Sequence, residues 1–347
     1  MTSSLDYYRQ AHRIAFGPLT FQAVLVARDK GVLKALEDEP KKGCTPEEVQ
    51  ARTGLGHYAV RVLLEGCAAA GAVEEAEGGR WRLGPVGRLL LHDELVRVNM
   101  DFTNDVCYKG AFHFGEAIDK GTAAGLKVFG PWNTIYEGLL NLPPKVRESW
   151  LAFDHRYSDG AFPTVSRTVF DRDVRKLLDV GGNTGKWALL CLLGQKNLEV
   201  TILDHPPQLE AARANAHKAG VEDRLRTEPM DLLDHSRPFP AGYDVVWMSQ
   251  LLDCFGEADV VGLLRRAREA LAPGGRVLVL ETYWDRQPNG VARDSIMATS
   301  LYFTCMANGN SRMYHSADLL RCMAAAGLKP VLDEQHGFHT LIACQAS

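Results

Sequence analysis

The chain has 347 residues and a formal net charge of −4, from 39 basic and 43 acidic side chains. Because there is no basic excess to grip a polyanion, nucleic acid is disfavoured as the main partner. No apolar run approaches the roughly 20 residues of a membrane span, and the first residues lack a signal-peptide pattern. The eight cysteines form no Cys-x-x-Cys pair. We therefore expect free thiols, a cytoplasmic location and no metal site.

The first third of the chain has the pattern of a winged helix. Helices and a short hairpin with a Gly-Gly tip are expected at residues 21–36, from 45 onward, 56–70 and 71–83. Thr45 is a typical N-cap, followed by proline and two acids in the first turn. The hairpin carries Glu74, Glu75 and Glu77, which would repel phosphate. The apolar helix faces therefore favour a subunit contact over DNA binding, usually that of a two-fold dimer.

Residues 92–145 are expected to be helical and are rich in aromatic side chains. After them, buried strands alternate with helices. The strands are expected at 177–180, 199–204, 224–230, 243–249, 276–281, 329–333 and 339–344, and the helices at 186–193, 207–219, 257–271, 292–307 and 316–326. Alternation of this kind predicts a mostly parallel sheet with both faces covered, closed by an antiparallel pair.

The turn after the first of these strands reads Asp179-Val-Gly-Gly-Asn-Thr-Gly185. Its glycines, at 181, 182 and 185, let the backbone turn tightly and approach a ligand. Asp179 would repel a pyrophosphate but suits the ammonium group of a cofactor that carries an amino acid. Asp204 ends the next strand, about twenty residues on, where a carboxylate reaches ribose hydroxyls in nucleotide-binding sheets.

Asp-x-Gly-Gly-x-Thr-Gly resembles the first motif of class I S-adenosylmethionine (SAM) methyltransferases. Together with the winged helix, it resembles the small-molecule O-methyltransferases over almost the whole chain. The resemblance implies an α/β fold: a Rossmann-like seven-stranded methyltransferase sheet preceded by an α-helical winged-helix dimerisation domain. It implies a dimerisation domain at 1–100, a helical linker and pocket roof at 101–165, and a SAM-binding domain at 166–347. It also implies the residues that hold SAM: Ser158, Asp179, Gly181, Gly182, Gly185, Asp204, Asp231, Leu232 and Ser249.

Two segments are expected to contact the acceptor. Phe153-Asp-His-Arg-Tyr-Ser-Asp159 resembles a family segment that borders the substrate at the positions of Asp154 and Tyr157. Four side chains follow one face of the 292–307 helix and the loop after it: Tyr302, Phe303, Met306 and Asn310. Together these residues would form an aromatic slot for a flat acceptor.

The family pattern breaks after the fourth strand. The family has Leu-His-Asp-Trp, with histidine as the general base, whereas this chain reads Leu251-Leu-Asp-Cys254. Leu252 therefore stands at the histidine position, and leucine cannot accept a proton. A phenol with a pKa near 10 is mostly neutral at pH 7, so the loss of this base should matter.

Four interpretations follow. Another residue is the base, with His155 and His315 as candidates. Asp253 is the base, although an ordinary carboxylate matches a phenol poorly, and the resemblance gives it mainly a positioning role. No dedicated base is needed, as in methylation of an electron-rich ring carbon held in line. Finally, the protein has lost methyl transfer.

We expect a cytoplasmic homodimer that transfers a methyl group from SAM to oxygen or a ring carbon of an aromatic metabolite, in secondary or pigment metabolism. The acceptor is either free or bound to an acyl carrier protein. The rival hypothesis is a SAM-binding protein that catalyses another reaction or acts as a regulator.

Overall fold

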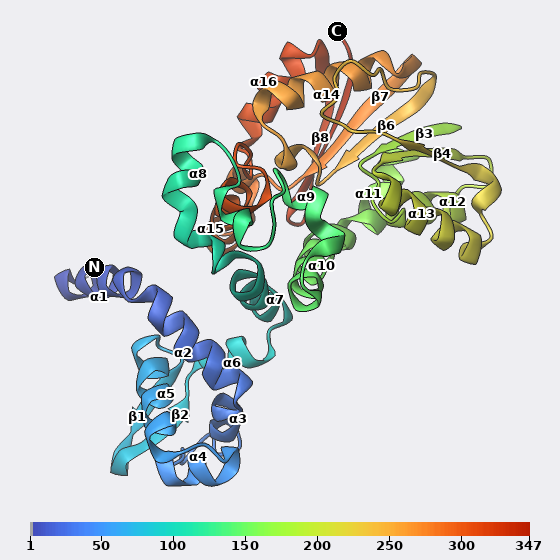
Figure 1. The fold of residues 1–347 in the computed structure, drawn as a ribbon. Helices are drawn as coiled ribbons and strands as arrows, with labels where there is room; N and C mark the ends of the chain where they lie inside the picture. The colour runs from blue at the N-terminus through green and yellow to red at the C-terminus, as the bar shows by residue number, and fades with distance from the viewer. Residues whose placement is uncertain (1–2) are drawn as a thin grey trace. The chain divides into compact units, whose positions relative to one another are not determined.

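The computed structural model describes residues 3–347, apart from the side chains of residues 158 and 159. The chain divides into two compact units, Met1–Thr103 and Asn104–Ser347, each with its own core (Figure 1).

The first unit consists of helices and one hairpin. Its elements are α1 (Ser4–Ala15), α2 (Gly17–Asp29), α3 (Val32–Glu37), α4 (Pro46–Thr53), α5 (His57–Ala69), β1 (Val73–Ala76), β2 (Arg80–Leu83), α6 (Pro85–His92) and α7 (Glu94–Phe102). Thr45 caps α4 in a reciprocal capping box with Glu48, as predicted. The single helix predicted over 21–36 is wrong. Gly31 adopts a left-handed conformation, with φ of 79°, and separates α2 from α3.

The second unit begins with helices that include a π-helical turn at Thr103–Cys107. The longer ones are α8 (Phe114–Lys120), α9 (Ile135–Gly138), α10 (Pro144–Ser158) and α11 (Phe162–Val169). A seven-stranded sheet follows, with strands β3 (Lys176–Val180), β4 (Glu199–Asp204), β5 (Leu225–Pro229), β6 (Tyr243–Ser249), β7 (Leu271–Glu281), β8 (Leu328–His336) and β9 (His339–Ala346). Their order is β5-β4-β3-β6-β7-β9-β8. Only β9 runs antiparallel to its neighbours, which confirms the predicted fold class.

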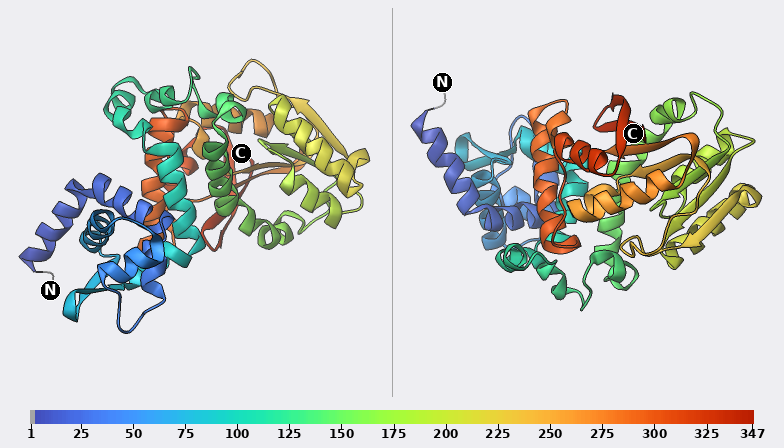
Figure 2. Two further views of the ribbon diagram at one scale, coloured as in Figure 1. Left: turned by 60° about the horizontal axis from the view of Figure 1, so that its bottom comes forward. Right: turned by 90° about the horizontal axis from the view of Figure 1, so that it is seen from above.

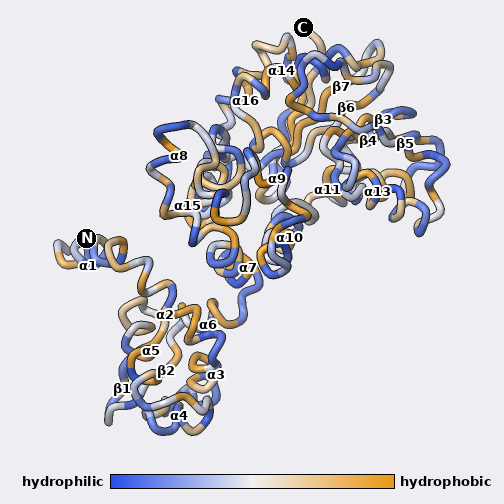
Figure 3. Tube along the Cα trace, in the orientation of Figure 1, coloured by the Kyte–Doolittle hydropathy of each residue, from blue (hydrophilic) through white to orange (hydrophobic). Residues whose placement is uncertain are grey.

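Helices cover both faces of this sheet. They are α12 (Lys186–Gly194), α13 (Pro206–Ala219), α14 (Glu257–Glu269) and α16 (Ser316–Ala325), whereas α15 (Gly290–Tyr302) packs against the helical segments Trp284–Arg286 and Phe303–Ala307. The core on one face joins α11, α12 and α13 to the strands, and the core on the other face joins α14 and α16. Figure 2 shows these layers from two further directions, and Figure 3 shows hydrophobic residues gathered along the strands. Within the described residues, no helix combines the length and apolar character needed to cross a bilayer.

Two predicted boundaries shift. The breaker cluster at 272–275 lies inside β7 rather than before it, because a register irregularity lets Leu271 pair with Tyr243 before the ladder resumes at Arg276. The helix predicted over 292–307 begins at Gly290 and ends as a π-helical turn at Phe303–Ala307. Such turns shift the facing of the side chains that follow.

Candidate active site

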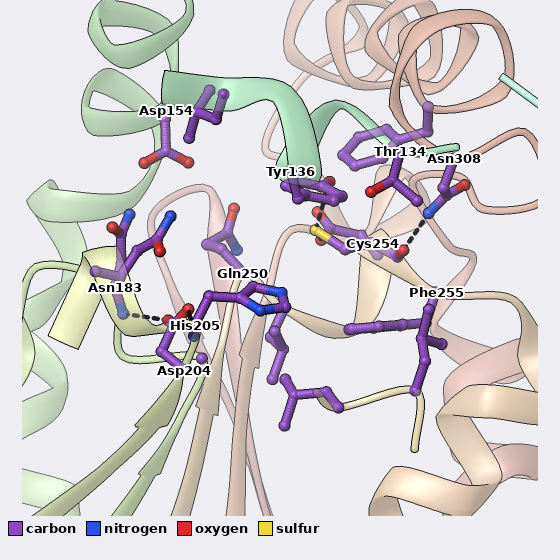
Figure 4. Close-up of a pocket in the computed structure, with 18 of the residues that line it drawn as sticks. Thr134, Tyr136, Asp154, Asn183, Asp204, His205, Gln250, Cys254, Phe255 and Asn308 are labelled. Carbon is purple, nitrogen blue, oxygen red and sulfur yellow. Dashed lines mark hydrogen bonds between the residues drawn. The ribbon is translucent and has the colours of Figure 1, made fainter. Parts of the chain in front are cut away.

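Two adjoining cavities open at the carboxyl ends of β3, β4 and β6, where open α/β sheets bind ligands. The larger has a volume of about 320 Å³ and the smaller about 90 Å³. Four residues line both: Asp154, Gly181, Asn183 and Gln250. Figure 4 shows Asp154 projecting from α10 toward Asn183 and Gln250. The shared lining makes these cavities two parts of one site.

Asp179 is the central charged group of the smaller cavity. It is the residue before the last in β3 and is 2% exposed. Burial, reinforced by the neighbouring carboxylate of Asp204, raises its pKa to about 8. Its Oδ2 has no hydrogen-bond partner among the described residues. A bound cation would therefore stabilise the ionised form of this carboxylate.

The glycines of the turn leave room that side chains would fill. A Cβ on Gly182 would lie 2.6 Å from Oδ2 of Asp179, and one on Gly181 would lie 2.6 Å from Cδ1 of Leu251. Gly181 also has a φ of 72°. Gly185 lines neither cavity. It caps α12, and a Cβ there would lie 3.1 Å from Cβ of Ala212, so it serves the packing of α12 on α13.

Asp204 connects the turn to β4. Its carboxylate accepts hydrogen bonds from the backbone N–H groups of Asn183, at 2.8 Å, and His205, at 2.7 Å. Burial nevertheless raises its pKa. Asp231 and Leu232 line the larger cavity beyond β5, together with Met230. These groups surround the end of the site where the resemblance places the ribose and adenine.

The other end of the larger cavity is aromatic with a short polar chain. The Tyr136 hydroxyl donates to Sγ of Cys254 at 2.9 Å, and this thiol donates to Oδ1 of Asp253 at 3.5 Å. Nδ2 of Asn308 donates to the carbonyl oxygen of Cys254 (Figure 4). On the opposite wall, the Trp150 indole donates to the Tyr302 hydroxyl at 2.7 Å. Phe153, Tyr157, Phe255 and Phe303 complete an apolar lining.

Asp253 is the buried carboxylate of this aromatic part, with 6% exposure. Desolvation raises its pKa to about 6, and its pKa is linked to that of the neighbouring Glu281. Glu281, in β7, accepts hydrogen bonds from the backbone N–H groups of Leu251 and Leu252 at 2.9 and 2.8 Å. Burial raises the pKa of Glu281 well above its usual range. Glu281 therefore holds the turn that presents Asp253.

Leu252 is fully buried in the core on the α14 side of the sheet and does not line either cavity. The residues of this turn that face the larger cavity are Leu251, Asp253, Cys254 and Phe255. Leu252, which the sequence pattern predicts to stand at the family's histidine position, is thus a packing residue.

The structure brings most of the predicted residues together. The cavity-lining ones are Asp154, His155, Tyr157, Asp179, Gly181, Gly182, Asp204, Asp231, Leu232, Ser249, Asp253, Tyr302, Phe303 and Asn310. Met306 does not line a cavity. It is fully buried, and its sulfur would collide with a Cβ on Gly110. The prediction for Ser158 concerns a side chain outside the described part of the structure.

The two candidate histidines lie in different surroundings. His155 lines the smaller cavity, where its Nδ1 is 2.9 Å from Nζ of Lys186. His315 lies outside both linings. Its Nδ1 accepts from the backbone N–H of Ala317 and so caps α16, and its ring packs edge-on against Trp284. His315 therefore has a local structural role.

Sequence reasoning missed several lining residues. They are Thr134, Tyr136, Trp150, Phe153, Asn183, His205, Gln208, Gln250, Cys254, Phe255, Asn308 and Met313. Asn183 and Gln250 have positive φ angles of 50° and 49°, unusual for residues other than glycine. Each follows directly on a strand or its turn, and that position was the available signal for both.

Comparison with known proteins identifies both units. A Dimerisation2-like domain matches residues 8–81, and an O-methyltransferase domain matches residues 162–328. An L-tyrosine C(3)-methyltransferase from Streptomyces lavendulae is 28% identical over 321 residues, which cover 91% of this chain and 86% of that protein.

Two solved structures share the fold. The SAM-dependent methyltransferase SibL, in its apo form, has a TM-score of 0.68 at 27% identity, covering 96% of this chain and 98% of SibL. The O-methyltransferase NcsB1 from neocarzinostatin biosynthesis, in complex with SAM and 2-hydroxy-5-methyl naphthoic acid, has a TM-score of 0.66 at 21% identity, covering 94% and 96%.

The sheet order, the glycine-rich turn and the buried carboxylates at its edge define a class I SAM-dependent methyltransferase. More closely, the chain joins a Dimerisation2-like domain to an O-methyltransferase domain, and its relatives include SAM-dependent O- and C-methyltransferases.

Proposed function

We propose that this enzyme transfers the methyl group of SAM to a ring carbon or a hydroxyl of a small aromatic acceptor. One observation carries the proposal: the smaller cavity, with its buried unpaired polar groups, opens into an aromatic cavity through four shared residues. The first suits the amino-acid end of a cofactor, and the second suits a flat acceptor.

The residues present fit SAM. Asp179 would accept from its ammonium group, Asp204 would contact the ribose hydroxyls, and Asp231 and Leu232 would border the adenine. When bound, SAM supplies an electrophilic methyl group on a sulfonium sulfur. The protein contributes alignment of the acceptor and exclusion of water.

Asp253 is our proposed proton acceptor. It lies in the aromatic part of the site, next to the Cys254 thiol and the Tyr136 hydroxyl. Its raised pKa brings it closer to a phenol than an ordinary carboxylate. His155 is the weaker candidate, because it lines only the cofactor side.

Two observations support a chemical class for the acceptor: the charges of the side chains that line the larger cavity, and the activity of one relative. Among the described residues, no lysine or arginine lines the larger cavity, whereas Asp154 and Asp253 do. A neutral or cationic phenol therefore suits it better than a free carboxylate. Similarity to a tyrosine C-methyltransferase supports carbon as the methylated atom.

The test is an assay with isotopically labelled SAM against paired phenols, such as tyramine and tyrosine, and a phenolic acid and its thioester. Mass fragmentation distinguishes O-methyl from C-methyl products. We expect the uncarboxylated or thioester member of each pair to react faster. Binding of SAM without transfer to any phenol would favour a non-methylating enzyme instead.

We also propose a cytoplasmic homodimer. The match to a dimerisation domain supports the dimer. Six of the eight cysteines are buried, which suits thiols in a reducing compartment.

A further inference from the structure

Four buried polar atoms around the smaller cavity have no hydrogen-bond partner among the described residues. They are Oδ2 of Asp179, Oγ of Ser249, and the indole Nε1 atoms of Trp187 and Trp247. Leaving a buried polar group unpaired costs about 1–3 kcal/mol, so native structures keep few such groups. Four around one cavity of about 90 Å³ indicate that a bound ligand satisfies them.

The sheet register directs three of these atoms to the same side. Asp179 of β3 and Trp247 of β6 are direct partners in the parallel ladder. Ser249 follows Trp247 by two residues, so its side chain lies on the same face of β6. This arrangement places one carboxylate, one indole and one hydroxyl on the face of the sheet that α12 covers.

The fourth atom comes from α12 itself. The Trp187 ring stacks on the Trp247 ring, with centroids 4.3 Å apart and an interplanar angle of 17°. Phe162 also packs against Trp187, at a centroid distance of 5.3 Å and an interplanar angle of 54°. Both indoles are at least 97% buried, with 3% and 0% exposure. Their orientations are therefore held by packing, which presets the direction of both N–H groups.

The set comprises three hydrogen-bond donors and one acceptor. An α-amino-acid group needs this combination, because its carboxylate accepts hydrogen bonds and its ammonium group donates them. An indole nitrogen can only donate, and it suits a carboxylate oxygen. We propose that Trp187 and Trp247, with Ser249, bind the carboxylate of the methionine part of SAM, while Asp179 binds its ammonium group. This inference rests on the proposed SAM-dependent function. It assigns carboxylate recognition to a pair of neutral indoles, although Lys186 lines the same cavity beside His155.

The test is calorimetric binding of three ligands to the full-length protein. They are S-adenosylhomocysteine, its decarboxylated analogue S-adenosyl-3-thiopropylamine, and 5′-methylthioadenosine. We expect the wild type to prefer S-adenosylhomocysteine over the decarboxylated analogue by tenfold or more. Trp247→Phe and Trp187→Phe keep an aromatic ring, although a smaller one, and remove the N–H. Each should reduce that preference about tenfold, which corresponds to about 1.4 kcal/mol, since each removes one hydrogen bond to a charged group.

Binding of 5′-methylthioadenosine should stay within about twofold in each variant, because that ligand has no carboxylate. Ser249→Ala adds a variant with little effect on packing, and it should also reduce the preference. Trp284→Phe, outside both cavities, is the matched control.

An unchanged preference in the tryptophan and serine variants would overturn the proposal. So would a preference that disappears only in Lys186→Met, which would assign the carboxylate to the lysine. If the wild type binds none of the three ligands, the SAM-dependent function itself fails. That outcome is distinct from binding without discrimination, which contradicts only the carboxylate site.

Discussion

Asp179 links ligand binding to pH. Its pKa is about 8 in the folded protein against an ordinary 3.8, so the folded state holds a proton that the unfolded state has released between these values. Stability from this group is full below the lower value and falls as pH rises toward 8.

We therefore predict that the ligand-free protein loses stability from pH 5 to 8. The slope from Asp179 should be about 1.4 kcal/mol per pH unit. Asp179→Asn should remove that part of the slope, as measured by urea unfolding at several pH values. Parallel pH curves for the two proteins would show that Asp179 keeps an ordinary pKa.

The proton acceptor is tested at Asp253. Asp253→Asn should lower turnover about 100-fold or more while leaving S-adenosylhomocysteine affinity within about threefold, because the side chain faces the acceptor part of the site. In the wild type, turnover should rise with pH and level off above about 6, where the carboxyl is ionised. A flat profile and an active Asn variant would favour alignment alone.

A further prediction concerns the reintroduction of a histidine at Leu252. Because its side chain is fully buried in the core, Leu252→His should not restore a base. It should destabilise the protein by about 2–5 kcal/mol through burial of an unpaired polar ring. Thermal unfolding and the methyl-transfer assay measure both effects, and a stable variant with faster turnover would contradict this placement.

At the scale of elements, the turn between β3 and α12 requires the backbone of Gly182 to lie close to Asp179 and Ile202. In Gly182→Ala the added methyl would collide with the Asp179 carboxylate and Cγ2 of Ile202, at 2.6 and 2.8 Å. We predict at least a tenfold loss of S-adenosylhomocysteine affinity by calorimetry, about 1.4 kcal/mol or more. Gly194→Ala is the matched control at the end of α12, where a Cβ meets nothing within 4 Å. Equal binding by both variants would show that the turn relaxes freely.

Strands β4 and β6 were predictable because each combines a buried apolar run with a polar end. The bounds of β4 and β6 match the expected ones. The break between α2 and α3 at Gly31 could not be predicted, because the apolar pattern continues across this left-handed residue.

The cavity-lining residues at the carboxyl ends of the strands were predictable because they lie at strand ends or in the turns after them. The cavity-lining roles of Tyr136 and Trp150 could not be predicted. Both residues lie in helices whose position over the sheet depends on tertiary packing rather than on local sequence pattern. Met306 shows the same limit: helical spacing alone could not separate a lining side chain from a packed one.

At the scale of the whole molecule, α1 has no buried residue, although it is strongly amphipathic. Its apolar side chains Tyr8 and Ile14 are 68% and 81% exposed, as expected of a surface that binds another subunit. We predict that Tyr8→Glu combined with Ile14→Glu shifts the protein toward monomer in analytical ultracentrifugation at micromolar concentration. Phe338→Glu, in the turn between β8 and β9, should leave the mass unchanged. An intact dimer in the double variant would exclude α1 from the interface.

The sheet order has a consequence for synthesis. β9 lies between β7 and β8 but follows both in the chain. Until residues 339–346 have left the ribosome, β7 has one unpaired edge and β8 has no strand to pair with. The sheet therefore keeps an exposed edge until β9 inserts between β7 and β8, and this insertion completes the sheet.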